Sequence, residues 1–309
     1  MTKKEKEDIH EVIILLYGYL FYLGVIYMES KIIDFELVKN CFLPRNEESY
    51  KGDFGHTLII AGSVGFTGAP YIVSQTAVRS GAGLVTLGVY PELMEIMSMK
   101  AIEYMTVSLS EKDRLLTLLD KCSCVAFGPG MGNSERTRKY LEDTLAYCSS
   151  PIVLDADGLN VLAGDMEPIL KKRGAIIMTP HLGEFSRLIH IPITEIKKNM
   201  EQFAKDFAKK YKIILVLKDH RTVVTDGKTI YRNSTGNSHM ASGGMGDCLT
   251  GLIASLISQG YEPFKAAVMG VYLHGYCGDE LAKNHFCVTA SDMIEKIPEV
   301  LSYFYNANL

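Results

Sequence analysis

The chain of 309 residues has no tryptophan, no excess of positive charge and no pair of cysteines with the spacing of a zinc or redox site. It carries 32 Lys and Arg against 36 Asp and Glu, a formal net charge of −4. That balance excludes a nucleic-acid binder that works by bulk positive charge. The seven cysteines form no C-x-x-C pair, so we interpret them as reduced thiols of a cytoplasmic protein without a metal-ligand set.

The amino-terminal residues 1–33 form a segment of their own. Residues 12–28 carry no charge, and a run of this length is at the lower limit for a membrane span. The run contains four tyrosines, which prefer the membrane interface to the bilayer centre. No small-residue cleavage site follows, which disfavours a cleaved signal peptide. Three interpretations stay open: a membrane anchor, a helix packed on a partner subunit, and a start codon assigned too early, with Met28 as the true first residue.

Strands and helices alternate from residue 34 onward, with no internal repeat and no low-complexity linker. Short apolar runs predict strands at residues 57–61, 84–89, 124–127, 152–154, 175–178 and 213–217. Helices are expected at 68–80, 115–120, 200–211, 248–259 and 266–281. Asp226-Gly227, between strands at 222–225 and 229–231, predicts a hairpin. This order predicts one α/β domain, residues 34–309, with a mostly parallel central sheet and helices on both faces.

Glycine or polar residues follow five of the predicted strands. They are Gly62-Ser63, residues 128–132 (GPGMG), residues 155–157 (DAD), residues 179–181 (TPH) and Lys218. In open α/β sheets, ligands bind beyond the carboxyl ends of the strands. We therefore expect a ligand that crosses several strands, such as a nucleotide together with a second substrate.

A glycine–aspartate loop is the strongest local signal. Residues 242–247 (SGGMGD) precede an apolar helix, and the glycines allow a ligand to approach the backbone closely. The helix start presents free N–H groups that can hold a phosphate. Asp247 either takes a proton from a substrate hydroxyl that attacks this phosphate, or only caps the helix. The chain has neither a G-x-x-x-x-G-K-[ST] loop nor a dinucleotide-binding G-x-G-x-x-G turn.

Six stretches in order resemble the ADP/ATP-dependent NAD(P)H-hydrate dehydratases, a family with a ribokinase-like fold. They are KGDFG at 51–55, GAGLV at 81–85, GPGMG at 128–132, LDADGLNVL at 154–162, TPHLGEF at 179–185 and TGNSHMASGGMGDCLTG at 235–251. The resemblance implies a lyase that uses ADP or ATP, with Mg²⁺, on the S form of hydrated NADH or NADPH. Phosphorylation of the ring hydroxyl, followed by elimination, would restore the reduced cofactor.

The resemblance also implies roles for individual residues. Asp247 would be the catalytic base, and the amides of Gly243, Gly244 and Gly246 would hold the transferred phosphoryl group. The hydrate would contact Ala69, Gly130, Gly132, His181 and Asp247. The nucleotide would contact Lys218, Asp219, His220, Arg221 and Thr222 as well as the glycine loop. Glu184 could help to place Mg²⁺ through water.

Simpler roles stay open for several of these residues. His181 could be a strand-end histidine without a ligand, and Asp155, Asp157 and Asn160 could be turn residues that shape the groove. Asp219 and His239 stand where the family usually has glycine. A carboxylate near a phosphate would repel it, so Asp219 is expected to point away or the nucleotide to sit differently. A protonated His239 could help to bind phosphate or be a surface replacement.

Many members of the family carry a fused epimerase domain. The residues before Asp34 are too few for such a domain, so we expect the epimerase to be a separate chain. The resemblance also implies a homo-oligomer. No nucleic-acid partner is expected, and membrane contact depends on residues 1–33. Two other functions stay open: a ribokinase-like kinase of a vitamin precursor, which would stop at the phosphoester, and a catalytically silent nucleotide-binding module.

Overall fold

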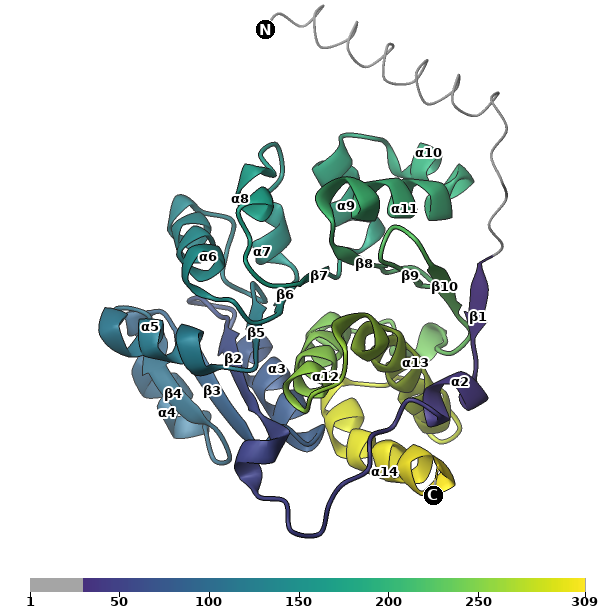
Figure 1. Ribbon diagram of the computed structural model, residues 1–309, viewed down its shortest axis with the longest axis horizontal. Helices are drawn as coiled ribbons and strands as arrows, with labels where there is room; N and C mark the ends of the chain where they lie inside the picture. The colour runs from purple at the N-terminus through teal and green to yellow at the C-terminus, as the bar shows by residue number, and fades with distance from the viewer. Residues whose placement is uncertain (1–29, 309) are drawn as a thin grey trace, which may run out of the picture. The chain divides into compact units, whose positions relative to one another are not determined.

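A computed structural model describes residues 30–308, and the three interpretations of the amino-terminal segment concern residues that lie almost entirely outside this range. The described chain forms one sheet of ten strands in the order β1-β10-β9-β8-β7-β6-β5-β2-β3-β4 (Figure 1). The strands are β1 (Lys31–Ile33), β2 (His56–Ile60), β3 (Leu84–Val89), β4 (Met105–Ser108), β5 (Cys124–Phe127), β6 (Ile152–Leu154), β7 (Ile176–Met178), β8 (Ile214–Leu217), β9 (Val223–Thr225) and β10 (Ile230–Asn233).

Strand direction places the loops that carry the candidate site on one edge of the sheet. Every neighbouring pair among strands β2 to β8 is parallel. Strand β9 runs antiparallel to both β8 and β10, and β1 pairs in parallel with β10. All strands except β9 therefore end on the same edge, where ligands of open α/β sheets bind.

Helices cover both faces of the sheet (Figure 1). One face is covered by α2 (Phe35–Lys39), α3 (Gly68–Arg79), α4 (Met94–Lys100), α12 (Met245–Ser258), α13 (Pro263–Ala282) and α14 (Ala290–Asn308). The other is covered by α5 (Lys112–Lys121), α6 (Glu135–Tyr147), α7 (Asp157–Asn160), α8 (Glu167–Leu170), α9 (Leu182–Ile189), α10 (Ile193–Lys198) and α11 (Met200–Tyr211). The strands are short apolar runs because both of their faces are buried.

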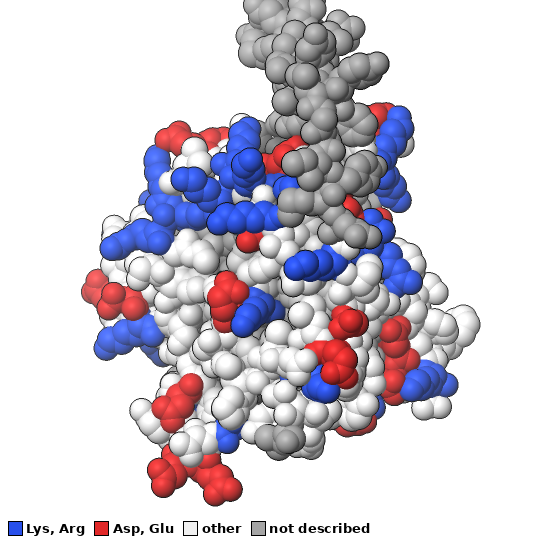
Figure 2. Space-filling view, turned by 45° about the vertical axis from the view of Figure 1, so that its right-hand side comes forward, with Lys and Arg blue, Asp and Glu red and all other residues white. Residues whose placement is uncertain are grey.

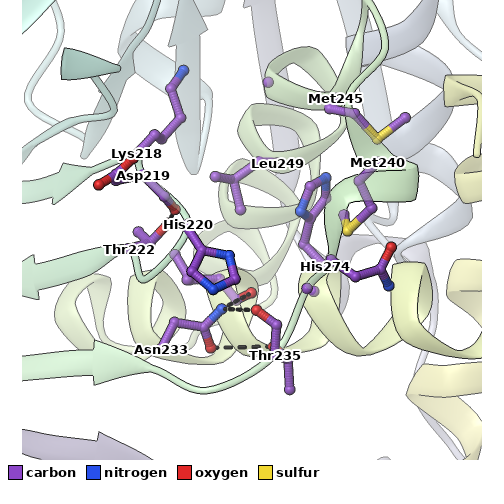
Figure 3. A pocket seen from close by; sticks show the side chains of 15 residues that line it. Lys218, Asp219, His220, Thr222, Asn233, Thr235, Met240, Met245, Leu249 and His274 are labelled. Atoms are coloured by element: carbon purple, nitrogen blue, oxygen red, sulfur yellow. Dashed lines mark hydrogen bonds between the residues drawn. The ribbon is translucent and has the colours of Figure 1, made fainter.

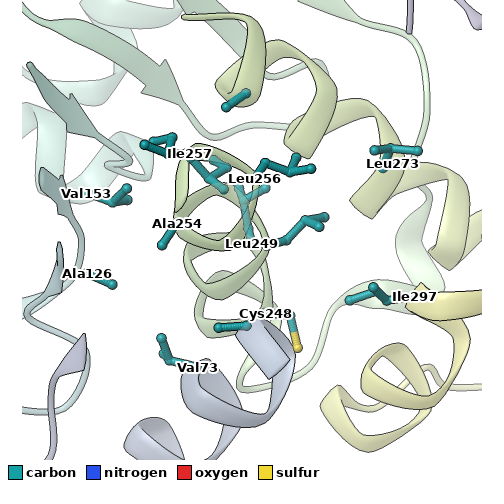
Figure 4. Packing of buried hydrophobic residues seen from close by; sticks show 14 of the residues in the cluster. Val73, Ala126, Val153, Cys248, Leu249, Ala254, Leu256, Ile257, Leu273 and Ile297 are labelled. Atoms are coloured by element: carbon teal, nitrogen blue, oxygen red, sulfur yellow. The ribbon is translucent and has the colours of Figure 1, made fainter. Parts of the chain in front are cut away.

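Alternate residues of each strand enter two separate cores. Ala126 and Val153 face the core that contains α12, whereas Val125 and Leu154 face the core that contains α5 to α11. Figure 4 shows α12 packed among Val73 of α3, Leu273 of α13 and the sheet. A Cβ at Gly251 would lie 2.5 Å from the carbonyl oxygen of Val73, so the absence of a side chain lets α3 and α12 approach closely. This packing fixes α12 beneath the candidate site.

The structure confirms the predicted fold class and most of the predicted elements. The strands predicted at 84–89, 124–127 and 152–154 have the expected bounds, and the hairpin of β9 and β10 is present. Helix α12 begins at Met245, three residues earlier than expected. The sequence interpretation did not include β1, β4, α4, α6 or α14. Within residues 30–308, no helix has the length and apolar character that a membrane crossing needs.

Candidate active site

The glycine loop is held in one conformation at the start of α12. Gly244 is the N-cap of the helix and has φ +88°. A Cβ at this position would lie 2.8 Å from Cδ1 of Ile72 and 2.9 Å from Cβ of Ala290, so both φ and space require glycine. The Ser242 hydroxyl donates to the carbonyl oxygen of Val288 at 2.6 Å and ties the loop to the residues before α14. The free N–H groups of the helix start are thereby preorganised.

Asp247 lies in the first turn of α12 but does not cap it. The N-cap is Gly244, and within the described residues the Asp247 carboxylate forms no hydrogen bond. The pKa of Asp247 is raised from 3.8 to about 6, mainly by burial and also by the charge of Asp155, while the charge of Lys218 lowers it. A carboxylate with free lone pairs and a pKa near neutrality suits a general base.

A buried ion pair lies beside the helix start. Asp155, directly after β6, is 2% exposed and accepts from Nζ of Lys218 and from Oγ1 of Thr250, both at 2.8 Å. Burial alone would lower the pKa of Lys218, but Asp155, Glu184 and Asp247 outweigh burial and raise it. Lys218 therefore stays charged at neutral pH. Its Nζ lies 3.3 Å from the position of a Cβ built on Gly246, next to the proposed phosphate loop.

His181 and Glu184 form a reciprocal cap at the start of α9. The His181 N–H donates to Oε2 of Glu184 at 2.8 Å, and Nδ1 of His181 accepts from the N–H groups of Gly183 and Glu184 at 2.9 and 3.2 Å. Because Nδ1 accepts, a neutral ring carries its proton on Nε2, which lies 3.5 Å from Oε1 of Glu184. Burial raises the pKa of Glu184, Lys218 lowers it and Asp155 raises it.

Three of the five residues predicted to bind the hydrate, Ala69, Gly130 and Gly132, lie in the segments that follow β2 and β5. A Cβ at Gly130 would lie 3.0 Å from Cβ of Ala69, at the start of α3. The N–H of Gly132 donates to Oδ2 of Asp157 at 2.7 Å, and Nδ2 of Asn160 donates to Oδ1 of the same carboxylate at 3.1 Å. Asp157 thus does more than form a turn, since it fixes the loop after β5.

A cavity of about 210 Å³ lies next to the glycine loop (Figure 3). Of the residues predicted to contact a nucleotide, Lys218, Asp219, His220, Thr222 and Gly246 line it, whereas Gly243 and Gly244 do not. Arg221 does not line the cavity either; its guanidinium donates to the carbonyl oxygen of Ser234 at 2.7 Å.

The opposite wall of the cavity contains residues that the sequence interpretation did not include. Asn233, Thr235, Asn237, Met240 and His274 line it. Asn233 ends β10, so the strand-end rule used for the other loops could have found it. Burial lowers the pKa of His274 to about 4, and Nε2 of this ring has no partner within the described residues. A neutral ring therefore presents an acceptor nitrogen near the cavity.

The two positions that depart from the family pattern have different surroundings. Asp219 is among the residues that line the cavity, and its backbone carbonyl oxygen accepts from Oγ1 of Thr222 at 3.1 Å. His239 does not line the cavity; its Nδ1 contacts the carbonyl oxygens of His285 and Phe286 at 3.1 and 2.9 Å. His239 thus ties the 3-10 helix at Ser238–Met240 to the loop before α14.

The fold belongs to the ribokinase-like class. The solved structure of a ribokinase-like superfamily protein from Enterococcus faecalis V583 matches this chain with a TM-score of 0.81 at 25% identity. The match covers 91% of this chain and 98% of that protein. A family model described as NAD(P)H-hydrate dehydratase matches residues 57–299. The chain belongs to this family of lyases, as the sequence motifs predicted.

Relatives with whole-chain coverage agree with this assignment. The ADP-dependent (S)-NAD(P)H-hydrate dehydratase of Bacillus subtilis is 32% identical over 277 residues, which are 87% of this chain and 97% of the relative. The structure of ADP/ATP-dependent NAD(P)H-hydrate dehydratase from Bacillus subtilis, co-crystallised with ATP and Mg²⁺, matches with a TM-score of 0.80 at 29% identity. This match covers 90% of this chain and 99% of that one.

Other relatives are longer. A bifunctional NAD(P)H-hydrate repair enzyme from Moorella thermoacetica is 39% identical over 274 residues, which are 84% of this chain and 52% of the relative. The chain therefore spans about half the length of the bifunctional relatives that it matches.

Proposed function

We propose that residues 34–309 catalyse the ADP- or ATP-dependent dehydration of (S)-NAD(P)H hydrate to NADH or NADPH. One observation carries this proposal: the Asp247 carboxylate has no hydrogen bond within residues 30–308 and has a pKa of about 6, at the start of a glycine-capped helix beside the charged Lys218. This combination supplies a base and a phosphate site within one turn of helix.

The first step is a phosphoryl transfer. The hydroxyl oxygen on C6 of the hydrated ring attacks the terminal phosphorus of the nucleotide, and Asp247 takes the hydroxyl proton. The bond from this phosphorus to the bridging oxygen breaks, which leaves AMP from ADP or ADP from ATP. The N–H groups of Gly244 and Gly246 and the Lys218 ammonium bind the charge that develops on the phosphoryl oxygens.

The second step is an elimination. The C6–O bond breaks and phosphate leaves with the bonding electrons, while the C5–H bonding electrons form the C5–C6 double bond and the C5 proton passes to water. Phosphate departs much more readily than hydroxide, so phosphorylation is what makes the reaction fast. The loop of Gly130 and Gly132, fixed by Asp157, and the Nε2–H of His181 would position the hydrate.

The side chains near Lys218 fit a Mg²⁺ ion that is bound mainly through the nucleotide. In the part of the chain that the structure describes, no group of three His, Cys, Asp or Glu is arranged to hold a metal ion. Mg²⁺ usually keeps several waters and takes few protein carboxylates beside phosphate oxygens. Glu184 would contact the ion through water, and the ion would supply positive charge to the phosphates.

We further propose that the chain works beside an epimerase activity and assembles as a homo-oligomer in the cytoplasm. The dehydratase accepts one isomer of the hydrate, so the other isomer must be converted first. The name of the Moorella thermoacetica relative, which describes a bifunctional repair enzyme, supports this coupling.

The decisive experiment mixes purified protein, Mg²⁺ and hydrated NADH with either ADP or ATP. The absorbance of the reduced nicotinamide is expected to rise and to depend on the nucleotide. A phosphorylated vitamin precursor without this rise would identify a kinase instead. Equal activity, near zero, in the wild type and in D247N would identify a silent nucleotide binder.

A further inference from the structure

The edge of the sheet opposite the candidate site is strongly basic. Arg173 lies shortly before β7, Lys212 before β8 and Lys228 before β10, and Lys31 begins β1. Because these four strands are parallel to one another, their amino ends share one edge. Neighbouring strands are about 4.8 Å apart, so the row from β1 to β7 extends over about 20 Å.

Contacts within this region join the cationic residues into one group, here called the basic edge. Lys172 donates from Nζ to the carbonyl oxygens of Tyr211 and Lys212 at 2.6 and 2.8 Å. A Cβ at Gly227 would lie 2.6 Å from the backbone nitrogen of Lys209, so the hairpin tip packs on the end of α11. The basic edge consists of Lys31, Lys171, Lys172, Arg173, Lys209, Lys210, Lys212 and Lys228.

The positive charge of the basic edge is only partly compensated. Glu167 pairs with Lys171 at 2.9 Å, Asp226 accepts from the backbone N–H of Lys228, and Asp206 is one turn before Lys210 on α11. Burial and the charge of Lys212 lower the pKa of Lys172 to about 8. Figure 2 shows more Lys and Arg than Asp and Glu side chains over the upper part of the molecule, with both kinds present there, whereas the chain as a whole has a net charge of −4.

Three observations favour a lipid surface over nucleic acid as the partner. Seven of the eight cations are lysines, which act as point charges rather than as bidentate readers of bases. The nearby aromatic ring of Tyr211 lies under the Lys210 ammonium, at 5.0 Å from the centroid, and is not free to stack on a base. Leu170, which is 64% exposed, adds an apolar side chain next to Lys171.

The segment that precedes β1 also favours a lipid surface. Lys31 begins the edge strand β1 beside the hairpin residue Tyr231, so the chain enters the sheet at the basic edge. The uncharged sequence at residues 12–28 ends three residues before Lys31. Stable membrane association usually needs two signals, such as an apolar segment and a polybasic surface.

We propose that the basic edge is a docking surface for membranes that contain anionic lipids. The candidate active site, at the opposite edge of the same sheet, then faces the solvent and keeps free access to its substrates. Lysines near such a surface each contribute about a fivefold change in partitioning, and the attraction weakens with salt.

Vesicle sedimentation of the full chain tests this proposal. We expect binding to phosphatidylcholine vesicles that contain phosphatidylglycerol, and less binding as NaCl rises from about 0.1 M to about 1 M. The variant K209Q/K210Q/K212Q is expected to partition about 100-fold less. The control K100Q/K112Q/K139Q removes as much charge from exposed lysines on α4, α5 and α6 and should bind as the wild type does.

The proposal fails if the chain binds pure phosphatidylcholine vesicles as strongly as vesicles that contain phosphatidylglycerol, since the apolar amino-terminal sequence alone would then account for the binding. It also fails if both variants bind equally, or if the chain binds a single-stranded RNA and no anionic vesicle. Dehydratase activity in solution should be equal in both variants, because none of these lysines touches the candidate site. That readout separates this proposal from the proposed function.

Discussion

Replacing Asp247 with asparagine is expected to lower the activity strongly and, at neutral pH, to stabilise the fold. The folded-state pKa of Asp247 is about 6, against 3.8 for an ordinary aspartate. A raised carboxyl pKa means that ionisation costs more in the folded than in the unfolded state. Below pH 3.8 both states are protonated and the cost vanishes; above pH 6 it is fully present.

The size of the effect follows from the shift. The pKa rises by about two, and at 1.36 kcal/mol per pKa unit this lowers the free energy of unfolding by at most about 3 kcal/mol. Because the carboxylate is partly exposed, we expect an effect of about 1–3 kcal/mol. For a domain of this size the D247N variant should gain roughly 2–10 °C in Tm. Loss of a general base should lower kcat about 10²- to 10⁴-fold.

Urea unfolding at about pH 7.5 and about pH 4 measures the difference, since most of the gain of D247N should be lost at the lower pH. D120N, at an exposed aspartate on α5, is the matched control and should change neither activity nor stability. A lower Tm of D247N at pH 7.5 would refute the argument, because it would mean that the carboxylate stabilises the helix start. Unchanged activity would refute the assignment of the base.

Three further predictions follow from the same geometry. The value of kcat/KM should fall as the pH drops below about 6, because protonated Asp247 cannot accept a proton; a profile flat to pH 4.5 would contradict this. In urea unfolding, G244A should lower the free energy of unfolding by at least about 1–2 kcal/mol, because it places a Cβ against Ile72 and Ala290 at positive φ. The control A241G, at an exposed residue, should change the free energy of unfolding little. T250V should lower the free energy of unfolding by about 1–3 kcal/mol, because it removes a hydrogen bond from buried Asp155. T250S keeps the hydroxyl and should retain most of this stability.

The central strands could be predicted from the sequence because both of their faces are buried, which requires apolar runs. Residues 124–127 and 152–154 carry no polar side chain except a thiol, and their bounds are confirmed. Edge strand β4 has no such constraint: Met105 is 43% exposed and Thr106 is half-buried, so the run does not stand out. Helix α14 contains Pro298, which usually indicates a helix boundary.

The charge environment of the candidate site was less accessible to sequence reasoning than its motifs. Asp155 and Lys218 are 63 positions apart, and no local pattern distinguishes a buried ion pair from two separate turn residues. The second wall of the cavity depends on how β10 and α13 meet across the sheet. Motifs indicate which residues end each strand, whereas tertiary packing decides which of them become neighbours.

The reversed strand β9 has a consequence for how a nucleotide would be held. If a helix instead of β9 connected β8 to β10, the loops after β8 and after β10 would be joined through a separately packed element. Here residues 218–222 precede β9, Asn233 ends β10 and residues 234–237 follow it, so the hairpin joins part of one wall to part of the other through its ladder of backbone hydrogen bonds, while α13 adds His274 to the second wall. The paired strands β9 and β10 therefore hold these two loops at a fixed spacing on one side of the cavity.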